Sequence, residues 1–228
     1  MSKSGTVIAA ARRHAKAPAS AAPKAAVVAV NQKFAPAPAR VCRVGYFLVP
    51  NFTMMAFTSA IEPLRLANLV ADQTLYEWAL YSADGQPVRA SNGVEVRVDG
   101  PVAATPDLYA VILCAAIGVQ LVNNRDCVSD EPRTTEIDTA LGAVCTGTYV
   151  LAKAGLVDDY RTTIHWENQA SLVAEFPHLH VTSELFEIDR NRFACAGGTA
   201  AADMMLSIIA RDHGAALATA VTDQLIHH

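Results

Sequence analysis

The stretch GAVCTGTYVLAKAGLVDDYRTTIHWE, residues 142–167, decides the fold of this chain. It starts in an apolar run that ends at Cys145, and it continues as a helical pattern over Thr146–Ala154. A thiol therefore lies where a buried strand ends and a helix begins. Gly142 and Gly147 permit the sharp, crowded turn that such a junction requires. The stretch predicts a nucleophile elbow within an α/β fold.

On both sides of this stretch, apolar β-rich runs alternate with helical patterns. Strands separated by helices of about ten or more residues are typical of a mainly parallel sheet covered on both faces. The predicted strands are 40–49, 76–82, 94–98 (an edge or hairpin strand), 108–115, 141–145, 179–182, 184–189 and 192–196, and the predicted helices are 52–70, 146–154, 165–176, 199–212 and one from about 215.

Length and composition narrow the class of protein. The chain has 228 residues, of which 52% are hydrophobic and 18% charged, enough for one substantial core. Charged residues interrupt every apolar stretch before the roughly 18–20 residues that a transmembrane helix needs, so no membrane contact is expected. The five cysteines form no CxxC pair, and neither they nor the seven histidines show metal-ligand spacing. We expect a cytoplasmic protein without a metal or cofactor.

The charge is divided unevenly along the chain. Residues 1–40 carry seven basic and no acidic residues, which leaves 11 basic and 22 acidic residues, a net charge of −11, for 41–228. The first forty residues also hold fourteen Ala and four Pro but few bulky apolar side chains, so a disordered tail is predicted. A transit peptide and a basic arm for nucleic acid are the alternatives. Residues 41–228 are the predicted folded domain. Their net negative charge disfavours binding to the phosphates of a nucleic acid.

Three side chains are candidates for chemistry at the elbow. The helix that follows Cys145 is expected to stabilise its thiolate and lower its pKa, with the backbone amide of Thr146 as an oxyanion donor. His165, twenty residues further on, is the candidate base, because a short loop and strand would return it to the carboxyl edge of the sheet. Glu62, on the first predicted helix, is expected to share a proton with the thiol.

Plainer interpretations exist for each of these residues. A cysteine after an apolar strand is commonly a small buried hydrophobe, but the glycine-flanked context with a following histidine favours a functional Cys145. Glu62 could instead pair with Arg65 or Lys153. Trp166 could line a pocket beside the histidine or only pack against its neighbours.

The same stretch resembles the elbow-to-histidine segment of the ThiJ/PfpI superfamily, which has the class I glutamine amidotransferase-like fold, a flavodoxin-like three-layer sandwich. Two more segments, FTSAIEPLRLAN at 57–68 and RFACAGGTAAADMMLSIIARDHG at 192–214, resemble the GlxA-like subgroup of AraC-type transcription regulators. The resemblance covers about 41–228. Members of that subgroup join an amidotransferase-like sensor domain to a C-terminal DNA-binding domain with two helix-turn-helix motifs, and this chain stops before such a domain.

The resemblance implies a ligand-sensing and dimerising domain that meets DNA only through a C-terminal domain. Its effector would be a small nitrogen metabolite, meaning an amino acid, a betaine or a related amine. The apolar stretch Ala200–Ala210, with the helix after it, is either a dimer surface or core. The implied ligand-binding residues are Cys145, Thr146, His165, Trp166, Glu62, Ala115 and Ala116.

The resemblance also allows a catalytic interpretation. A cysteine-dependent hydrolase, hydratase or glyoxalase-like enzyme would use Cys145, His165 and Glu62, and an oxidation sensor would use the thiol alone. Superfamily hydrolases carry a Gly pair where this chain has Ala115 and Ala116. The two methyl groups restrict the backbone, which disfavours a working oxyanion hole.

Overall fold

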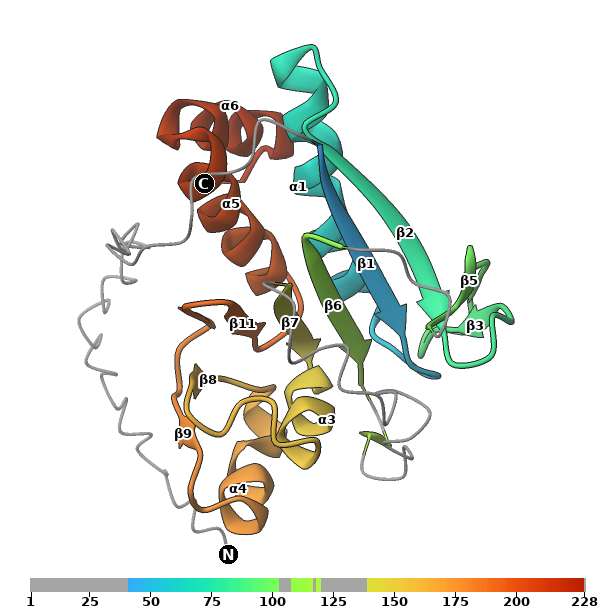
Figure 1. The fold of residues 1–228 in the computed structure, drawn as a ribbon, viewed down its shortest axis with the longest axis vertical. Coiled ribbons are helices and arrows are strands. Elements are labelled where there is room, and N and C mark those ends of the chain that lie inside the picture. The colour runs from blue at the N-terminus through green and yellow to red at the C-terminus, as the bar shows by residue number, and fades with distance from the viewer. Residues whose placement is uncertain (1–40, 103–107, 117, 120–138, 228) are drawn as a thin grey trace, which may run out of the picture.

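A seven-stranded sheet organises the computed structural model, which describes residues 41–102, 108–116, 118–119 and 139–227 (Figure 1). Its strand order is β10-β11-β7-β6-β1-β2-β5. Every neighbouring pair is parallel except β10 and β11, so the predicted mainly parallel sheet is confirmed. The strands are β1 (Cys42–Leu48), β2 (Tyr76–Ser82), β5 (Gly100–Pro101), β6 (Ala110–Ala115), β7 (Ala140–Cys145), β10 (Phe186–Asp189) and β11 (Arg192–Cys195).

Helices cover both faces of the sheet. Successive side chains of a strand point to opposite faces, so Tyr46 and Leu48 of β1 enter one core and Phe47 enters the other. The first core is closed by α1 (Met54–Ala71), α5 (Ala200–His213) and α6 (Ala215–Leu225), and the second by α3 (Gly147–Lys153) and α4 (Trp166–Glu175). The flavodoxin-like three-layer arrangement is therefore confirmed.

Two small sheets accompany the main one. β3 (Val88–Arg89) and β4 (Glu95–Val96) pair antiparallel, which agrees with the hairpin strand predicted at 94–98. β8 (Arg161–Thr162) and β9 (His180–Val181) pair in parallel. The sequence pattern missed β3 and β5, because two residues are too few to show a period, whereas β8 agrees with the short strand expected before His165.

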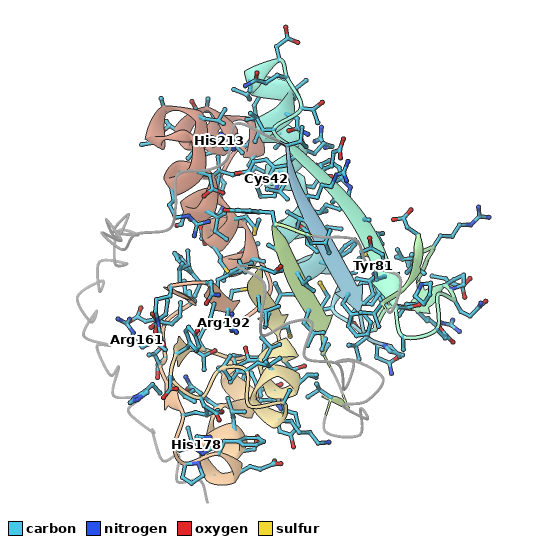
Figure 2. All side chains as sticks on the ribbon, in the orientation of Figure 1. Cys42, Tyr81, Arg161, His178, Arg192 and His213 are labelled. Carbon is cyan, nitrogen blue, oxygen red and sulfur yellow. The ribbon has the colours of Figure 1, made fainter. Side chains whose placement is uncertain are left out.

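The strand order places a topological switch point between β1 and β6. The chain continues from β1 to β2 on one side and from β6 to β7 on the other, so the carboxyl ends of β1, β6 and β7 meet at one edge. Cys42, which begins β1, and Tyr81, near the end of β2, mark the amino and carboxyl edges (Figure 2). Ligand sites in open α/β sheets lie at the carboxyl edge.

The apolar face of α5 belongs to the core. This helix packs against α1 and α6, and most of the stretch predicted as a possible dimer surface is buried within the single chain. Core was the alternative interpretation, and it is the one observed. The buried residues are Ala200, Ala201, Ala202, Met204, Met205, Leu206, Ile208 and Ile209.

Two further predictions concern the N-terminal tail and membrane-spanning helices. The predicted tail, residues 1–40, lies outside the described residues. Within the described residues, no helix combines the length and the hydropathy that crossing a bilayer requires.

Gly142→Ala tests the packing of β7 against β11. A Cβ at this position would lie 2.1 Å from Cε2 of Phe193, so the ring or a strand has to move. We expect the free energy of unfolding, measured by urea titration, to fall by about 1–3 kcal/mol, as in overpacked cores. The matched control is Gly100→Ala, where a Cβ would meet no atom within 4 Å, and a change within about 0.5 kcal/mol is expected. Equal losses in the two variants would contradict this account.

Candidate functional site

Cys145 lies at the predicted bend, as the last residue of β7. Its φ of 60° is in the left-handed region, which costs a non-glycine residue about 1–3 kcal/mol and is held only by the surrounding structure. Gly147 provides the space for this bend, since a Cβ there would lie 2.5 Å from the carbonyl oxygen of Leu113. Gly142 has another role than the predicted one, because it accommodates a ring from β11 rather than the turn.

The thiol of Cys145 is nearly buried, with 6% of the residue exposed. Thr53 Oγ1 donates a hydrogen bond to its sulfur at 3.6 Å, and the backbone N–H of Thr146 also favours the thiolate form. Burial nevertheless outweighs these two donors and raises the pKa of the thiol. The predicted lowering by the following helix is therefore wrong. α3 has only seven residues, and its N-terminus does not offset the desolvation of the sulfur.

Gly197 covers the thiol from the loop between β11 and α5. A Cβ on this residue would lie 3.2 Å from the sulfur of Cys145 and 2.9 Å from its Cβ. Its φ of 99° also disfavours any other residue. Sequence reasoning missed this residue, although a glycine pair, Gly197 and Gly198, between a strand and a helix was the available signal.

His165 contacts the bend at Cys145 through its backbone. Its N–H donates to the carbonyl of Cys145 at 3.1 Å, and α4 begins at the next residue. The partly exposed imidazole lies 3.8 Å from a carboxylate oxygen of Glu167, and its ring centroid is 5.8 Å from that of Trp166. Trp166 is 72% exposed, so it does not pack into the core. The two predicted residues thus lie together beside the bend.

Ala115 and Ala116 form another wall of the bend. Ala115 ends β6 and is the register partner of Cys145. Ala116 bridges to Phe52, and its carbonyl accepts a hydrogen bond from the hydroxyl of Thr146 at 2.7 Å. Neither alanine has a positive φ. The role of the Thr146 amide as an oxyanion donor stays a prediction.

Glu62 does not reach the thiol. Its carboxylate pairs with Arg65, with an oxygen 2.6 Å from Nη2, and 44% of its side chain is exposed. Glu62 follows Thr53 by nine residues, which corresponds to about 13 Å along a helix. The predicted carboxyl–thiol pair is therefore replaced by a hydroxyl–thiol pair, and the interpretation that placed Glu62 beside Arg65 is the one observed.

Three exposed hydrophobic residues belong to segments that lie next to the bend, and we call them the apolar rim: Met55, Trp166 and Leu185, exposed by 59%, 72% and 64%. Met55 lies two residues after the hydroxyl partner of the thiol, and Trp166 directly follows His165. The carbonyl of Leu185 accepts the N–H of Ala196, the residue before the covering glycine.

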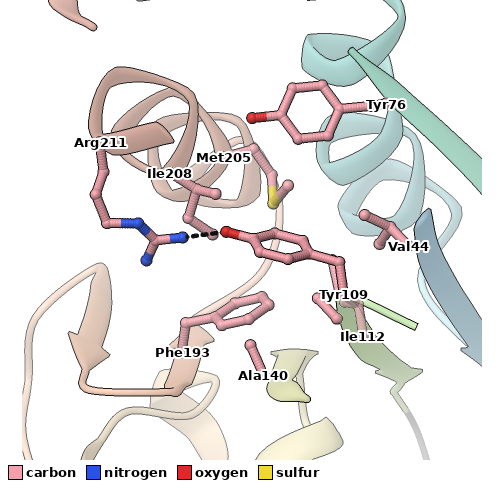
Figure 3. Close-up of a pocket in the computed structure, with 10 residues that line it drawn as sticks. Val44, Tyr76, Tyr109, Ile112, Ala140, Phe193, Met205, Ile208 and Arg211 are labelled. Carbon is pink, nitrogen blue, oxygen red and sulfur yellow. Dashed lines mark hydrogen bonds between the residues drawn. The ribbon is translucent and has the colours of Figure 1, made fainter. Parts of the chain in front are cut away.

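A small cavity lies elsewhere, near the amino ends of the strands (Figure 3). Its volume of about 10 Å³ is room for one water molecule, not for a metabolite. Beside it, the hydroxyl of Tyr109 donates to Asp212 at 2.7 Å and accepts from Arg211 at 2.8 Å. These bonds attach the end of α5 to the sheet. The lining residues are Val44, Tyr76, Tyr109, Ala110, Ile112, Ala140, Phe193, Met205, Ile208 and Arg211.

Metal binding finds no support in the described parts of the chain. No group of three or more His, Cys, Asp or Glu side chains there is arranged to hold an ion.

Comparison with known proteins places the chain among relatives of similar architecture. Residues 47–211 match the DJ-1/PfpI family. The chain is 41% identical over 184 residues to the HTH-type transcriptional regulator GbdR of Pseudomonas aeruginosa, covering 81% of this chain and 50% of the regulator. It is 35% identical over 190 residues to the HTH-type transcriptional regulator GlxA of Rhizobium meliloti, covering 82% and 58%.

A solved structure agrees with these matches. The crystal structure of an AraC family transcriptional regulator from Pseudomonas putida has a TM-score of 0.71 and 29% identity, covering 81% of this chain and 99% of that one. The chain spans about half the length of the curated relatives it matches.

The raised pKa of Cys145 predicts a shifted pH profile of alkylation. Only the thiolate reacts, so the rate of carbamidomethylation at Cys145, followed by peptide mass spectrometry, should be low at neutral pH and still rising above the ordinary thiol pKa of about 8.5. The control is the same peptide in the urea-unfolded chain. A rate that reached its plateau below pH 8 in the folded protein would contradict the assignment.

The raised pKa of Cys145 also predicts how the stability of the protein depends on pH. The unfolded thiol ionises at a lower pH than the folded one, so the contribution of Cys145 to stability is complete below the unfolded pKa and decreases as pH rises toward the folded pKa. Cys145→Ala should remove this part of the loss of stability between neutral and alkaline pH.

Proposed function

The chain belongs to the DJ-1/PfpI family, and from this premise we propose that residues 41–228 are the ligand-sensing and dimerisation domain of a GlxA-like AraC-type transcription regulator. The effector is a small nitrogen metabolite, an amino acid, a betaine or an amine, bound at the bend around Cys145. DNA binding belongs, in this proposal, to a separate C-terminal domain, as in the regulators that the chain resembles.

The observation that carries this proposal is the strained bend at Cys145, whose φ of 60° is held by the surrounding structure. A nucleophilic cysteine has to be a thiolate, and the surroundings of Cys145 favour its protonated form. The nearby carboxylate of Glu167 adds to the rise in pKa rather than reducing it. A neutral thiol with strained backbone suits recognition of a ligand better than attack on one.

The surroundings of the bend favour a cationic effector. Trp166 exposes its indole face, and the carboxylate of Glu167, 64% exposed, follows it in the chain. An ammonium group placed on an indole gains about 0.5–2 kcal/mol. Met55 and Leu185 offer apolar contacts for alkyl substituents on the nitrogen. Betaines and alkylated amines combine these two properties.

A cysteine-dependent hydrolase, hydratase or glyoxalase-like enzyme is the second candidate. It is favoured by one observation, the hydrogen bond that holds His165 beside Cys145. Turnover of an ester, amide or α-oxoaldehyde that disappears in Cys145→Ala would support it. Activity that survives this change would exclude a mechanism based on the thiol.

Binding of the effector is tested by isothermal titration with trimethylglycine, choline and L-arginine. We expect heat with at least one of them, and Trp166→Ala should weaken that binding about 2- to 30-fold through loss of the cation–π contact. The control is Val173→Ala, a partly exposed residue of the same helix outside the apolar rim, which should leave the affinity unchanged. A folded protein that gives no heat with any of the three would count against the proposal.

A cytoplasmic homodimer is the expected form of the protein. Light scattering at micromolar concentration should give twice the 24.2 kDa mass of the chain. The mass of one chain would remove dimerisation from the proposal and leave ligand sensing in place.

A further inference from the structure

Thr53 holds the N-cap position of α1 without capping it. Threonine is a good N-cap because its hydroxyl accepts a bond from a first-turn amide, and the backbone here has the usual extended conformation, with φ −78° and ψ 111°. The side chain forms no such bond, and the first turn of α1 contains no acidic residue. The hydroxyl bonds instead to the sulfur of Cys145 at 3.6 Å.

We propose that Thr53 is a positioning residue of this site, whose hydroxyl holds the Cys145 thiol in place of capping α1. A hydroxyl can donate and accept at once, but in the rotamer that donates to the sulfur the oxygen of Thr53 bonds to no first-turn amide, so in this proposal the two uses compete through the χ1 rotamer. Loss of the sulfur as a partner therefore returns the hydroxyl to the helix. The link to sensing rests on the proposed function, whereas the competition itself does not.

This competition gives α1 a way to respond to the site. α1 packs its buried face, including Ala60 and Leu64, into the same core as α5 and α6. The carbonyl of Ala60 also accepts the hydroxyl of Tyr46 on β1 at 2.7 Å. An effector that takes the place of Thr53 at the thiol would free the hydroxyl to order the first turn of α1, and that turn is part of one packed unit with α5 and α6.

The pH profile of Cys145 alkylation separates this role from an ordinary structural one. Thr53→Val keeps the shape of the side chain but removes the donor that stabilises the thiolate, so the profile should move to higher pH. Because only the thiolate reacts, alkylation at neutral pH should be roughly threefold slower than in the unchanged protein. Thr53→Ser keeps the hydroxyl and should retain the profile of the unchanged protein.

The unfolding midpoint in urea completes this test. Because the threonine does not cap α1, Thr53→Val should move the midpoint little. An unchanged alkylation profile together with a clear loss of stability would show that Thr53 is a helix cap and would overturn the proposal.

Hydrogen exchange tests the competition directly. In Cys145→Ala the hydroxyl has lost its sulfur partner, so the first-turn amides of α1, at Met55 and Ala56, should exchange more slowly than in the unchanged protein. The matched control is the double variant Thr53→Val with Cys145→Ala, in which no hydroxyl is available and the slowing should be absent. Equal exchange in the single and double variants would overturn the competition.

Neither experiment contains an effector, so their outcomes are independent of the titrations above. A protein that binds none of the amines but shows the Thr53 effects would retain this inference and lose the proposed function.

Discussion

A left-handed residue at the end of β7 is the constraint on which the site depends. Cys145 takes this conformation at a cost of about 1–3 kcal/mol, so its neighbours have to hold it there. Gly147 lets the backbone after the bend approach the carbonyl of Leu113, and Gly197 lets the next loop cover the sulfur. The main chain of His165 completes the arrangement by donating to the carbonyl of the strained residue. Side chains larger than hydrogen at either glycine would push one of these backbones away.

The same close approach decides the chemistry of the thiol. A helix N-terminus stabilises a nearby negative charge by about 0.3–1 kcal/mol at exposed positions, and α3 is a short helix. The loop at Gly197 and the walls formed by β6 exclude water from the sulfur, and this desolvation is the larger effect. Two donors, Thr53 and Thr146, reduce the rise in pKa without reversing it. The fold therefore keeps the bend of a nucleophile elbow while raising the pKa of the thiol.

The sequence predicted those features of the site that depend on neighbouring residues, and it failed for those that depend on residues far apart in the chain. Long apolar and amphipathic patterns located β1, β7 and α1 to within a few residues, and the position of Cys145 followed from a strand adjoining a helix. The hydrogen-bond partner of the thiol could not be predicted from these patterns. Glu62 was the candidate because its carboxyl group can exchange a proton with a thiol. It lies two and a half turns along α1, whereas Thr53 lies where the helix begins. Burial of the sulfur depends on a loop some fifty residues away in sequence, which no local pattern reports.

The helices around the site begin without side-chain caps. α1, α3, α4 and α5 all start at the carboxyl edge near the bend, and none of their N-cap side chains bonds to the first turn of its own helix. At α1 and α3 the capping hydroxyls are directed elsewhere, to the sulfur of Cys145 and to the carbonyl of Ala116. Each missing cap is worth about 0.5–2 kcal/mol, so stability alone would not favour this arrangement. Regions of low local stability are those that respond when a ligand binds, because a new partner for their backbone groups changes their order. In the proposed sensor, several helix starts around one strained residue would therefore give an effector at the bend more than one helix to act upon.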